Sequence, residues 1–559
     1  MKSIFLFLLV LITLNTFAQS SRYVIKFKDK EGTLFSISNP SQFLSQRSID
    51  RRIKQNISID ETDLPLSPIY IDRIRLSGNV QIINQSKWLN QVCIETNDID
   101  AITKINSFPF VLNMQAVKKM TIHEPATRKK FNLEYKKTTT TESTQGINDV
   151  ANYGNAFGQI HLHEGEFLHN KGYRGEGMLL AVIDAGFYHY KTLPAFDSVN
   201  LNKQIIDTYD FVKNKVSVNE EHTHGMNCFS IIASNIPGKL VGTSPKANFV
   251  LYRSEDIESE SPMEEQYWIV AMERADSIGV DITTTSLGYN KFDNPAFNYT
   301  YADLDGRTTM MARAATMAAR KGMILLASAG NEGTKDWKFI TTPADADSIL
   351  SVGAVDASGV PGTFSSYGPT ADGRIAPTVA SVGVNTFVST PSGGITNAGS
   401  GTSFAAPNLA GLVACFWQAF PEFTNMEIIE AIKKSSSTYK NPNNRIGYGI
   451  PNFRLAYEDL EKQRTKKRLI AILGEKVLKV FPNPFKDQFT VAVKPKHTAL
   501  ATFLLYNSDG RLITSQQLSL VENEVQEIIF KDLQPLQRGV YILKFMDGKM
   551  QETIQMMRQ

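Results

Sequence analysis

Cysteine is scarce in this chain, and so are long hydrophobic runs and any excess of one charge. The 559 residues include three cysteines and carry a formal net charge of +3. So few cysteines cannot form the disulfide framework of a small secreted domain. A nearly balanced charge, without basic runs interleaved with aromatics, excludes a nucleic-acid-binding protein. Beyond the N-terminus, no segment approaches the ~20 apolar residues that a membrane span requires. The remaining class is globular, with several domains.

The first residues have the features of a secretory signal peptide. Lys2 provides a positive start, residues 4–14 form a short apolar core, and Thr16-Phe17-Ala18 ends in small residues suited to cleavage. This apolar core is too short and wrongly flanked for a membrane helix. We therefore expect residues 1–18 to be removed and the mature chain to be exported from the cytosol.

Composition and periodicity divide the rest of the chain into five segments. Residues 19–120 contain strand-like and helix-like stretches and are expected to form a small α+β domain. Residues 121–147 are polar and without periodicity, so we expect an accessible linker of the kind where nicking concentrates. A large central domain follows at 148–462, then a second linker at 463–475. Residues 476–559 contain short alternating strands with Asp-Gly turns, which is typical of a small β-sandwich.

The central domain alternates short apolar strands with helical stretches. This alternation predicts an α/β fold with a mostly parallel sheet and helices on both faces. The predicted strands are 179–184, 247–252, 281–286, 323–329 and 349–355, and the predicted helices are 264–277, 308–321 and 403–420. In such folds the functional groups collect at the carboxyl ends of the strands.

A small hydroxyl residue, Ser403, stands where the helix at 403–420 is predicted to begin. Gly401 lets the backbone approach a ligand closely, and Pro407 is expected in the first turn, where its missing N–H costs little. Unpaired amides and the positive end of the helix dipole favour a developing oxyanion at this position. By itself such a serine is more often a helix cap, so a catalytic role requires partners upstream.

Two upstream residues are candidate partners. Asp184 ends the strand 179–184, and His224 is followed by Gly225 and an apolar, helix-compatible stretch. The nearest competitor, His222, lacks both features. A His-x-His pair also suggests a metal site, but no third ligand stands at a usual spacing for zinc. For Asp184 the alternative is a buried cap at the end of the strand.

Asn331 is the fourth candidate. It follows the strand 323–329 and lies next to Gly330. Its side-chain amide, together with the backbone N–H of Ser403, is suited to hold an oxyanion. The order Asp, His, Ser is one of the known orders of a serine triad.

Together these four segments resemble the subtilase family of serine peptidases, over roughly residues 148–460. The resemblance implies a subtilisin-like fold and hydrolysis of peptide bonds through an acyl-enzyme. Ser403 would be the nucleophile, His224 the base and then the acid, Asp184 the group that orients the imidazole, and Asn331 the oxyanion donor. Two departures are expected to alter the rate rather than abolish activity. Ala185 replaces a hydroxyl residue after Asp184, and Met226 replaces the usual Thr after His-Gly.

The resemblance also implies a substrate-binding site. The stretch 284–288 resembles the edge strand that pairs with an extended peptide, and 327–330 resembles the wall of the primary specificity pocket. The implied binding residues are Ser286, Leu287, Gly288, Ala327, Ser328, Ala329 and Gly330. Small residues in this wall predict a roomy, uncharged slot and a preference for apolar or aromatic residues before the cut.

Further expectations concern thiols, histidines and ions. Cys228 stands where some subtilases carry a thiol beneath the active-site histidine, so bulky mercurials should inhibit. We expect Cys228 and Cys415 to be two buried thiols rather than a bridge. His161, His163 and His169 are expected to be surface or capping groups. We expect no cofactor and no metal site. Calcium often stabilises this family, but no loop here is dense enough in carboxylates to name ligands.

The flanking domains carry resemblances of their own. By position, residues 19–120 resemble a subtilase propeptide, which templates folding and blocks the cleft; the alternative is an ordinary accessory domain. We expect activation by cleavage between 120 and 150. The stretches Phe481-Pro482-Asn483-Pro484-Phe485 and Gly539-Val540-Tyr541, with the basic end near Arg558, resemble the C-terminal sorting domain of the type IX secretion system. The alternative there is a carbohydrate-binding or surface-binding domain.

The sequence thus predicts a subtilisin-like serine endopeptidase, made as a zymogen and secreted or displayed at the cell surface after outer-membrane export. The expected partners are protein or peptide substrates, the chain's own propeptide as inhibitor and the type IX secretion machinery, with no nucleic acid; we expect a monomer. Two alternatives stay open. One is a catalytically idle surface protein that keeps the fold for binding, and the other is an exopeptidase or dedicated processing enzyme.

Overall fold

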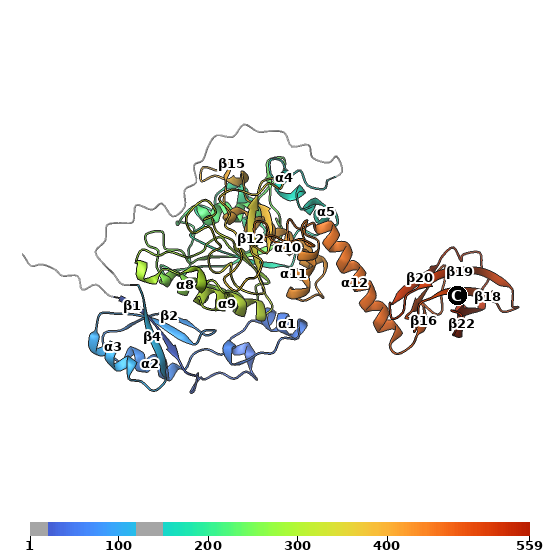
Figure 1. Cartoon of the computed structure of the whole chain (residues 1–559), viewed down its shortest axis with the longest axis horizontal. Coiled ribbons are helices and arrows are strands. Elements are labelled where there is room, and N and C mark those ends of the chain that lie inside the picture. Colours follow the sequence, from blue (N-terminus) through green and yellow to red (C-terminus); the bar gives the residue numbers. More distant parts are fainter. Residues whose placement is uncertain (1–20, 119–148) are drawn as a thin grey trace, which may run out of the picture. The chain divides into compact units, whose positions relative to one another are not determined.

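The computed structural model describes residues 21–118 and 149–559. It comprises two compact units, residues 1–456 and 457–559, as far as those ranges are described (Figure 1). The predicted signal peptide and the linker predicted at 121–147 lie outside the described residues. None of the helices in the described part of the chain is both long and apolar enough to cross a membrane.

Residues 21–118 form the expected α+β domain. Its four antiparallel strands are β1 (Ser21–Phe27), β2 (Gln81–Ser86), β3 (Gln91–Thr96) and β4 (Val111–Lys118), in the order β2-β3-β1-β4, and its helices are α1 (Gln46–Lys54), α2 (Pro68–Arg75) and α3 (Ile99–Asn106). Because strand side chains alternate, the sheet packs on both faces. Ile25 and Ile94 join the domain's own core, whereas Val24 and Cys93 pack against helix α8 (Pro262–Ile278) of the central domain.

Charged residues also join α1 to the central domain. Arg52 contacts Asp63 at 2.6 Å and Asp276 of α8 at 3.0 Å, and all three side chains are fully buried. Arg51 pairs with the same Asp276, and Lys321 lies 2.8 Å from Asp63. We call these five residues the buried ion cluster. Buried charges are tolerated only when paired in this way.

The central sheet has seven strands, and every neighbouring pair is parallel. Its order is β13-β12-β11-β10-β5-β9-β6. The strands are β5 (Leu179–Asp184), β6 (Ile205–Asp210), β9 (Asn248–Arg253), β10 (Ile282–Thr285), β11 (Ile324–Ser328), β12 (Leu350–Val355) and β13 (Val379–Val382). Outside the edge strand β6, almost every residue of these strands is buried. Continuous burial of this kind requires helices on both faces.

Alternation along the strands sorts their side chains between two helical layers. Ala181 and Ile183 of β5 lie in the core that α8 and α9 (Met310–Arg320) cover. On the opposite face α10 (Thr402–Ala419) packs across β10 to β13 and against α7 (His224–Ala233). The predicted α/β fold is therefore confirmed. The remaining elements of this domain are α4 (Phe157–His161), α5 (Gly165–Asn170), α6 (Asp197–Leu201), α11 (Asn425–Lys434) and the short strands β7 (Asn235–Ile236), β8 (Leu240–Val241), β14 (Thr386–Ser389) and β15 (Ile395–Gly399).

Pro407 is not in the first turn of α10, where the sequence analysis placed it. The helix begins at Thr402, so Pro407 lies inside it. A proline there leaves the carbonyl four residues earlier without its helical donor, and that carbonyl belongs to Ser403. It accepts instead from Ser286 Oγ at 2.7 Å and from Cys228 Sγ at 3.2 Å.

The second unit contains the expected β-sandwich. One sheet has the order β16-β17-β20 and the other β19-β18-β21-β22. The strands are β16 (Leu478–Phe481), β17 (Phe489–Val493), β18 (Ala499–Asn507), β19 (Leu512–Leu520), β20 (Gln526–Phe530), β21 (Gly539–Met546) and β22 (Gln551–Arg558). Inward-facing residues such as Phe489, Phe503 and Phe545 form its core. The strands at 478–481, 512–520 and 551–558 were not expected from the sequence.

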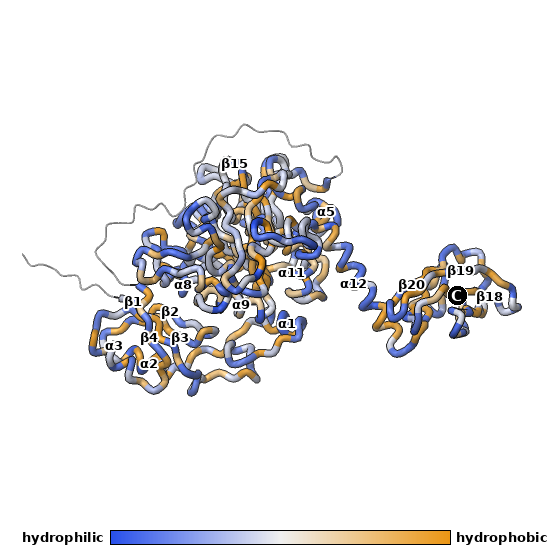
Figure 2. The backbone as a smooth tube through the Cα atoms, viewed as in Figure 1, coloured by the Kyte–Doolittle hydropathy of each residue, from blue (hydrophilic) through white to orange (hydrophobic). Residues whose placement is uncertain are grey.

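Most of the linker predicted at 463–475 is helical instead. Residues 463–473 form the second half of α12 (Phe453–Leu473). Figure 2 shows this helix as mostly hydrophilic, which explains why its sequence resembles a linker. It is ordered because a few apolar side chains, Leu469 and Leu473, pack on Ala492 of the sandwich.

Candidate active site

Asp184 and His224 meet at the carboxyl end of the central sheet. Asp184 is the last residue of β5, and His224 is the first residue of α7. The His224 Nδ1 and Asp184 Oδ1 atoms are 2.7 Å apart, and both side chains are almost fully buried. Asp184 Oδ1 also accepts from the Ala185 N–H at 2.7 Å. Among the described residues, Asp184 Oδ2 has no hydrogen-bond partner, which fits the replacement of a hydroxyl residue by Ala185.

The pair has a clear electrostatic effect on the imidazole. Burial alone lowers the pKa of His224, but the adjacent Asp184 carboxylate raises it well above the ordinary value of 6.5. A carboxylate so close favours the charged form of the ring. The site therefore stabilises an imidazolium, the state that a general base enters when it accepts a proton.

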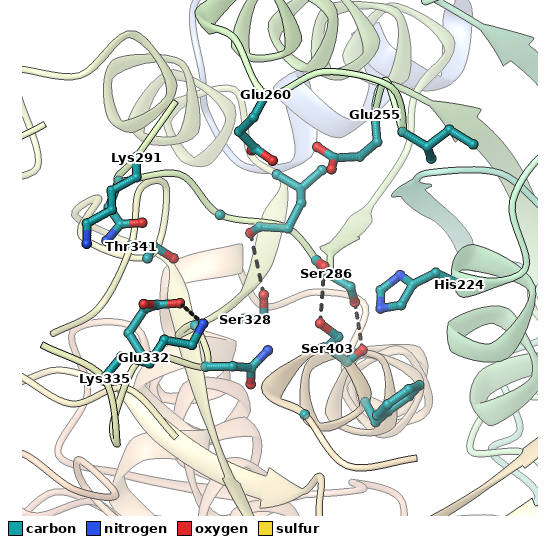
Figure 3. Close-up of a pocket in the computed structure, with 18 of the residues that line it drawn as sticks. His224, Glu255, Glu260, Ser286, Lys291, Ser328, Glu332, Lys335, Thr341 and Ser403 are labelled. Carbon is teal, nitrogen blue, oxygen red and sulfur yellow. Dashed lines mark hydrogen bonds and ion pairs between the residues drawn. The ribbon is translucent and has the colours of Figure 1, made fainter. Parts of the chain in front are cut away.

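Ser403 lies in the first turn of α10 and is 7% exposed. Its hydroxyl donates to the Ser286 carbonyl at 3.2 Å. Ser403 and His224 line the same pocket, and Figure 3 shows them next to each other beside Ser286. Catalytic hydrogen bonds are often loose in a free enzyme and tighten once substrate binds.

Asn331 is held in one orientation. Its Oδ1 accepts from the Thr402 N–H at 2.9 Å and from Thr402 Oγ1 at 3.2 Å. Because these bonds occupy the carbonyl end, Nδ2 is the donor left for a ligand in the pocket, which Asn331 also lines. The structure thus brings the four predicted residues Asp184, His224, Ser403 and Asn331 into one region.

The other histidines occupy different positions. His222 Nδ1 accepts from the His224 N–H at 3.1 Å, so His222 caps the start of α7, whereas His224 Nδ1 lies 2.7 Å from Asp184 Oδ1. Burial lowers the pKa of His163 and of His169 to about 4. These two were expected at the surface or as caps, but they are 0% and 1% exposed. Both rings lie in the core, where His163 contacts the Pro451 carbonyl at 2.9 Å and His169 contacts Cys415 of α10 at 3.7 Å. His161 is exposed, as expected.

The thiols are buried and unpaired with one another. All three cysteines are free, so the interpretation of Cys228 and Cys415 as two buried thiols is confirmed. Cys228 Sγ is 4.0 Å from His224 Nδ1, directly beneath the imidazole. Within the described residues, Asp184, His224 and Cys228 place ligand atoms within 4.8 Å of one another, so the metal-like grouping coincides with the candidate triad.

The predicted substrate-binding residues divide into two sets. Five of them line the pocket: Ser286, Leu287, Gly288, Ser328 and Gly330. Ala327 and Ala329 do not. They lie in the core on the other side of β11, because successive strand side chains point to opposite faces. β10 is also an interior strand rather than an edge; only residues 286–288 extend past its end.

The pocket contains charged groups that the sequence analysis missed. Its volume is about 690 Å³. The expectation of an uncharged slot concerned only the wall at 327–330 and stays a prediction. The walls of the whole pocket include six carboxylates against two ammonium groups, namely Glu255, Glu258, Glu260, Asp293, Glu332 and Asp336 against Lys291 and Lys335. The acids come from loops without periodicity, so no pattern identified them. Thr341, also missed, fits between Gly288 and Gly330, where its Oγ1 is buried and has no hydrogen-bond partner within the part of the chain that the structure describes.

Comparisons with known proteins agree with this arrangement. Residues 175–449 match the family model of the subtilase family, peptidase S8. Residues 22–134 match the peptidase S8 propeptide domain of Bacteroidota, which extends into the segment expected to be a linker. Residues 479–558 match the secretion system C-terminal sorting domain.

Individual relatives are more distant. The serine protease AprX of Bacillus subtilis (strain 168) is 27% identical over 307 residues, covering 50% of this chain and 65% of that protein. A thermophilic serine proteinase of Bacillus sp. (strain AK1) is 30% identical over 280 residues, covering 49% and 60%. The alignments therefore span less than two thirds of these relatives. The solved structure of MycP3 protease from the type VII (ESX-3) secretion system covers 57% of this chain and 91% of its own, at 20% identity and a TM-score of 0.44.

The chain therefore contains a domain of the subtilase family at residues 175–449, preceded by a peptidase S8 propeptide domain and followed by a secretion system C-terminal sorting domain.

Proposed function

We propose that the protein is a secreted serine endopeptidase that cleaves peptide bonds with Ser403. The observation that carries the proposal is the buried contact of 2.7 Å between His224 and Asp184, in the same pocket as Ser403 and Asn331. A structural serine needs neither a buried, charge-stabilised imidazole nor a fixed amide beside it.

In the proposed reaction, Ser403 Oγ attacks the scissile carbonyl and His224 Nε2 takes its proton. The resulting imidazolium is stabilised by Asp184, which does not itself become protonated. The backbone N–H of Ser403 and Asn331 Nδ2 hold the oxyanion of the tetrahedral intermediate. His224 then gives the proton to the leaving amine, and the acyl-enzyme is hydrolysed by water.

The experiment is labelling with a fluorophosphonate probe, which reacts quickly only with an activated serine. We expect labelling of the matured protein, loss of labelling in Ser403→Ala, and cleavage of a long unstructured peptide at internal bonds. A folded protein that is not labelled would instead support the idle binding protein. Cuts confined to peptide ends would support an exopeptidase.

The same proposal covers the zymogen and its export. Residues 21–118 would act as the chain's own inhibitor, held by the buried ion cluster and by Glu273, which accepts from the N–H groups of Lys87 and Trp88 at 2.8 and 3.1 Å. Activation would follow cleavage between 120 and 150. The sorting domain would direct the chain through the type IX machinery to the medium or the cell surface. The mass of the mature ends after export tests both steps.

A further inference from the structure

One wall of the pocket carries four carboxylates. The loop 254–261, between β9 and α8, supplies Glu255, Glu258 and Glu260, and Asp293 stands beside it. Figure 3 shows Glu255 and Glu260 on one side of the pocket and Glu332 with Lys335 on another. The Lys335 ammonium lies 2.7 Å from Glu332, so the ammonium groups only partly offset the carboxylates.

Backbone hydrogen bonds fix the shape of this wall. The Glu260 N–H donates to Asp293 Oδ2 at 2.8 Å, which ties the loop to the neighbouring segment. The Asp256 N–H donates to Glu264 Oε1 at 2.8 Å. Glu258 and Asp293 remain exposed to solvent. Like charges held close on an ordered loop create a negative potential that attracts cations.

A lysine already occupies one end of the wall. Lys118, the last residue of β4, places its Nζ 2.8 Å from Ser259 Oγ and 3.3 Å from Asp256 Oδ2, and Ser259 lines the pocket. Lys118 is thus one example of a basic side chain bound by this wall.

The sequence that follows Lys118 is itself basic. Residues 118–137 contain seven Lys or Arg residues against two Glu. One cluster is Arg128-Lys129-Lys130, and another is Lys136-Lys137. The acidic wall and this basic segment are complementary in charge, and charge complementarity of this kind selects partners as well as speeding association.

We propose that the acidic wall formed by Glu255, Glu258, Glu260 and Asp293 makes this enzyme select peptides with Lys or Arg near the scissile bond, and that the basic cluster at 128–130 of its own chain is one such substrate. The inference rests on the proposed peptidase function. It replaces the expected preference for apolar residues.

The test uses the matured full-length enzyme and two quenched fluorescent peptides. One carries residues 124–135 of the chain, and the other has glutamine in place of Arg128, Lys129 and Lys130. The variant is Glu258→Gln with Asp293→Asn. Its matched control is Asp347→Asn with Glu422→Gln, two exposed acids that do not line the pocket.

We expect the basic peptide to be cut faster than the glutamine peptide, at or next to its tribasic cluster. Exposed charge pairs contribute modestly to binding, so removing two carboxylates should lower kcat/KM for the basic peptide by about tenfold. The kcat/KM for the glutamine peptide should stay the same. High salt screens these charges, so it should reduce the difference in kcat/KM between the basic and the glutamine peptide. The control variant should behave as the parent enzyme.

Equal cleavage of both peptides by the parent enzyme would overturn the inference, and so would a Glu258→Gln, Asp293→Asn variant that keeps the parent's preference. In both cases Ser403 would still be labelled by a fluorophosphonate, which separates this failure from failure of the peptidase proposal. If neither peptide is cut and Ser403 is not labelled, both proposals fall together.

Discussion

The buried ion cluster predicts how strongly the propeptide domain is held. Replacing Arg52 with Ala removes a guanidinium that contacts Asp63 and Asp276, and all three side chains have no exposed surface. The substitution leaves two carboxylates buried with one cationic partner fewer. It changes no residue of the pocket, so its effect falls on the folding and docking of residues 21–118.

The magnitude follows from the contacts that remain. Breaking a buried ion pair costs about 3–5 kcal/mol, because the remaining charge stays buried without compensation. Here Asp63 keeps Lys321 at 2.8 Å, and Asp276 keeps Arg51. We therefore expect a cost at the lower end of this range, about 3 kcal/mol. This corresponds to a roughly 150-fold increase in the population of molecules in which residues 21–118 have opened.

The assay is hydrogen exchange, by mass spectrometry, of β1 to β4 in a precursor that also carries Ser403→Ala and so cannot process itself. Exchange through opening should accelerate by roughly the same 150-fold. The control is Arg75→Ala, which removes an exposed pair with Asp72 whose side chains are 54% and 61% exposed. That pair contributes at most about 1 kcal/mol.

Two results would refute this reasoning. One is an exchange rate in Arg52→Ala that matches Arg75→Ala. The other comes from Asp276→Asn, which alters the cluster from the peptidase side and leaves the propeptide sequence intact. If only Arg52→Ala accelerates exchange, the arginine stabilises the propeptide domain itself rather than its docking.

Three further predictions concern the site. Asn331→Ala should lower kcat by about 10²–10³ with little change in KM, measured on any cleaved peptide, because its amide acts on the oxyanion; a purely raised KM would contradict this. Since Asp184 raises the pKa of His224 above 6.5 and the base must be neutral to act, kcat/KM should rise with pH through that raised pKa. In Asp184→Asn this rise of kcat/KM should occur at lower pH. A rise at the same pH as in the parent enzyme would argue against His224 as the base. The free energy of unfolding should change in the opposite direction. The His224–Asp184 pair stabilises the fold below the raised pKa of His224, and this contribution is lost as pH rises through that pKa. Bulky mercurials should inhibit the parent enzyme but not Cys228→Ser, since the thiol lies 4.0 Å from the imidazole. Equal inhibition of the parent enzyme and of Cys228→Ser would show that the inhibition does not arise at Cys228.

The sequence was most informative where chemistry and local structure coincide. Asp184 ends an apolar strand, Ser403 opens a helix and Asn331 follows a strand, so each position could be placed from its own neighbours. Parallel strands then bring such ends to one edge of the sheet without any long-range information. This is why the fold class and the four candidate residues were predictable together.

Long-range pairings were not predictable. Arg51 and Arg52 stand in a polar helix, so their sequence is typical of a solvent-exposed face. Their partner Asp276 is 224 positions from Arg52 in the sequence. The acidic wall could not be predicted for a different reason, because Glu258 and Asp293 come from separate loops. Ala327 and Ala329 were misplaced because a run of small residues does not reveal which side of the strand faces the pocket.

Pro407 has a consequence for how the enzyme would accommodate different substrates. By leaving the Ser403 carbonyl open to Ser286 and Cys228, it lets two hydrogen bonds join the proposed nucleophile to the 286–288 segment and to α7. A peptide that pushes the 286–288 segment outward would carry the serine with it, so alignment between scissile bond and alcohol tolerates such displacement. An alanine at 407 would let the helix reclaim that carbonyl and uncouple the two.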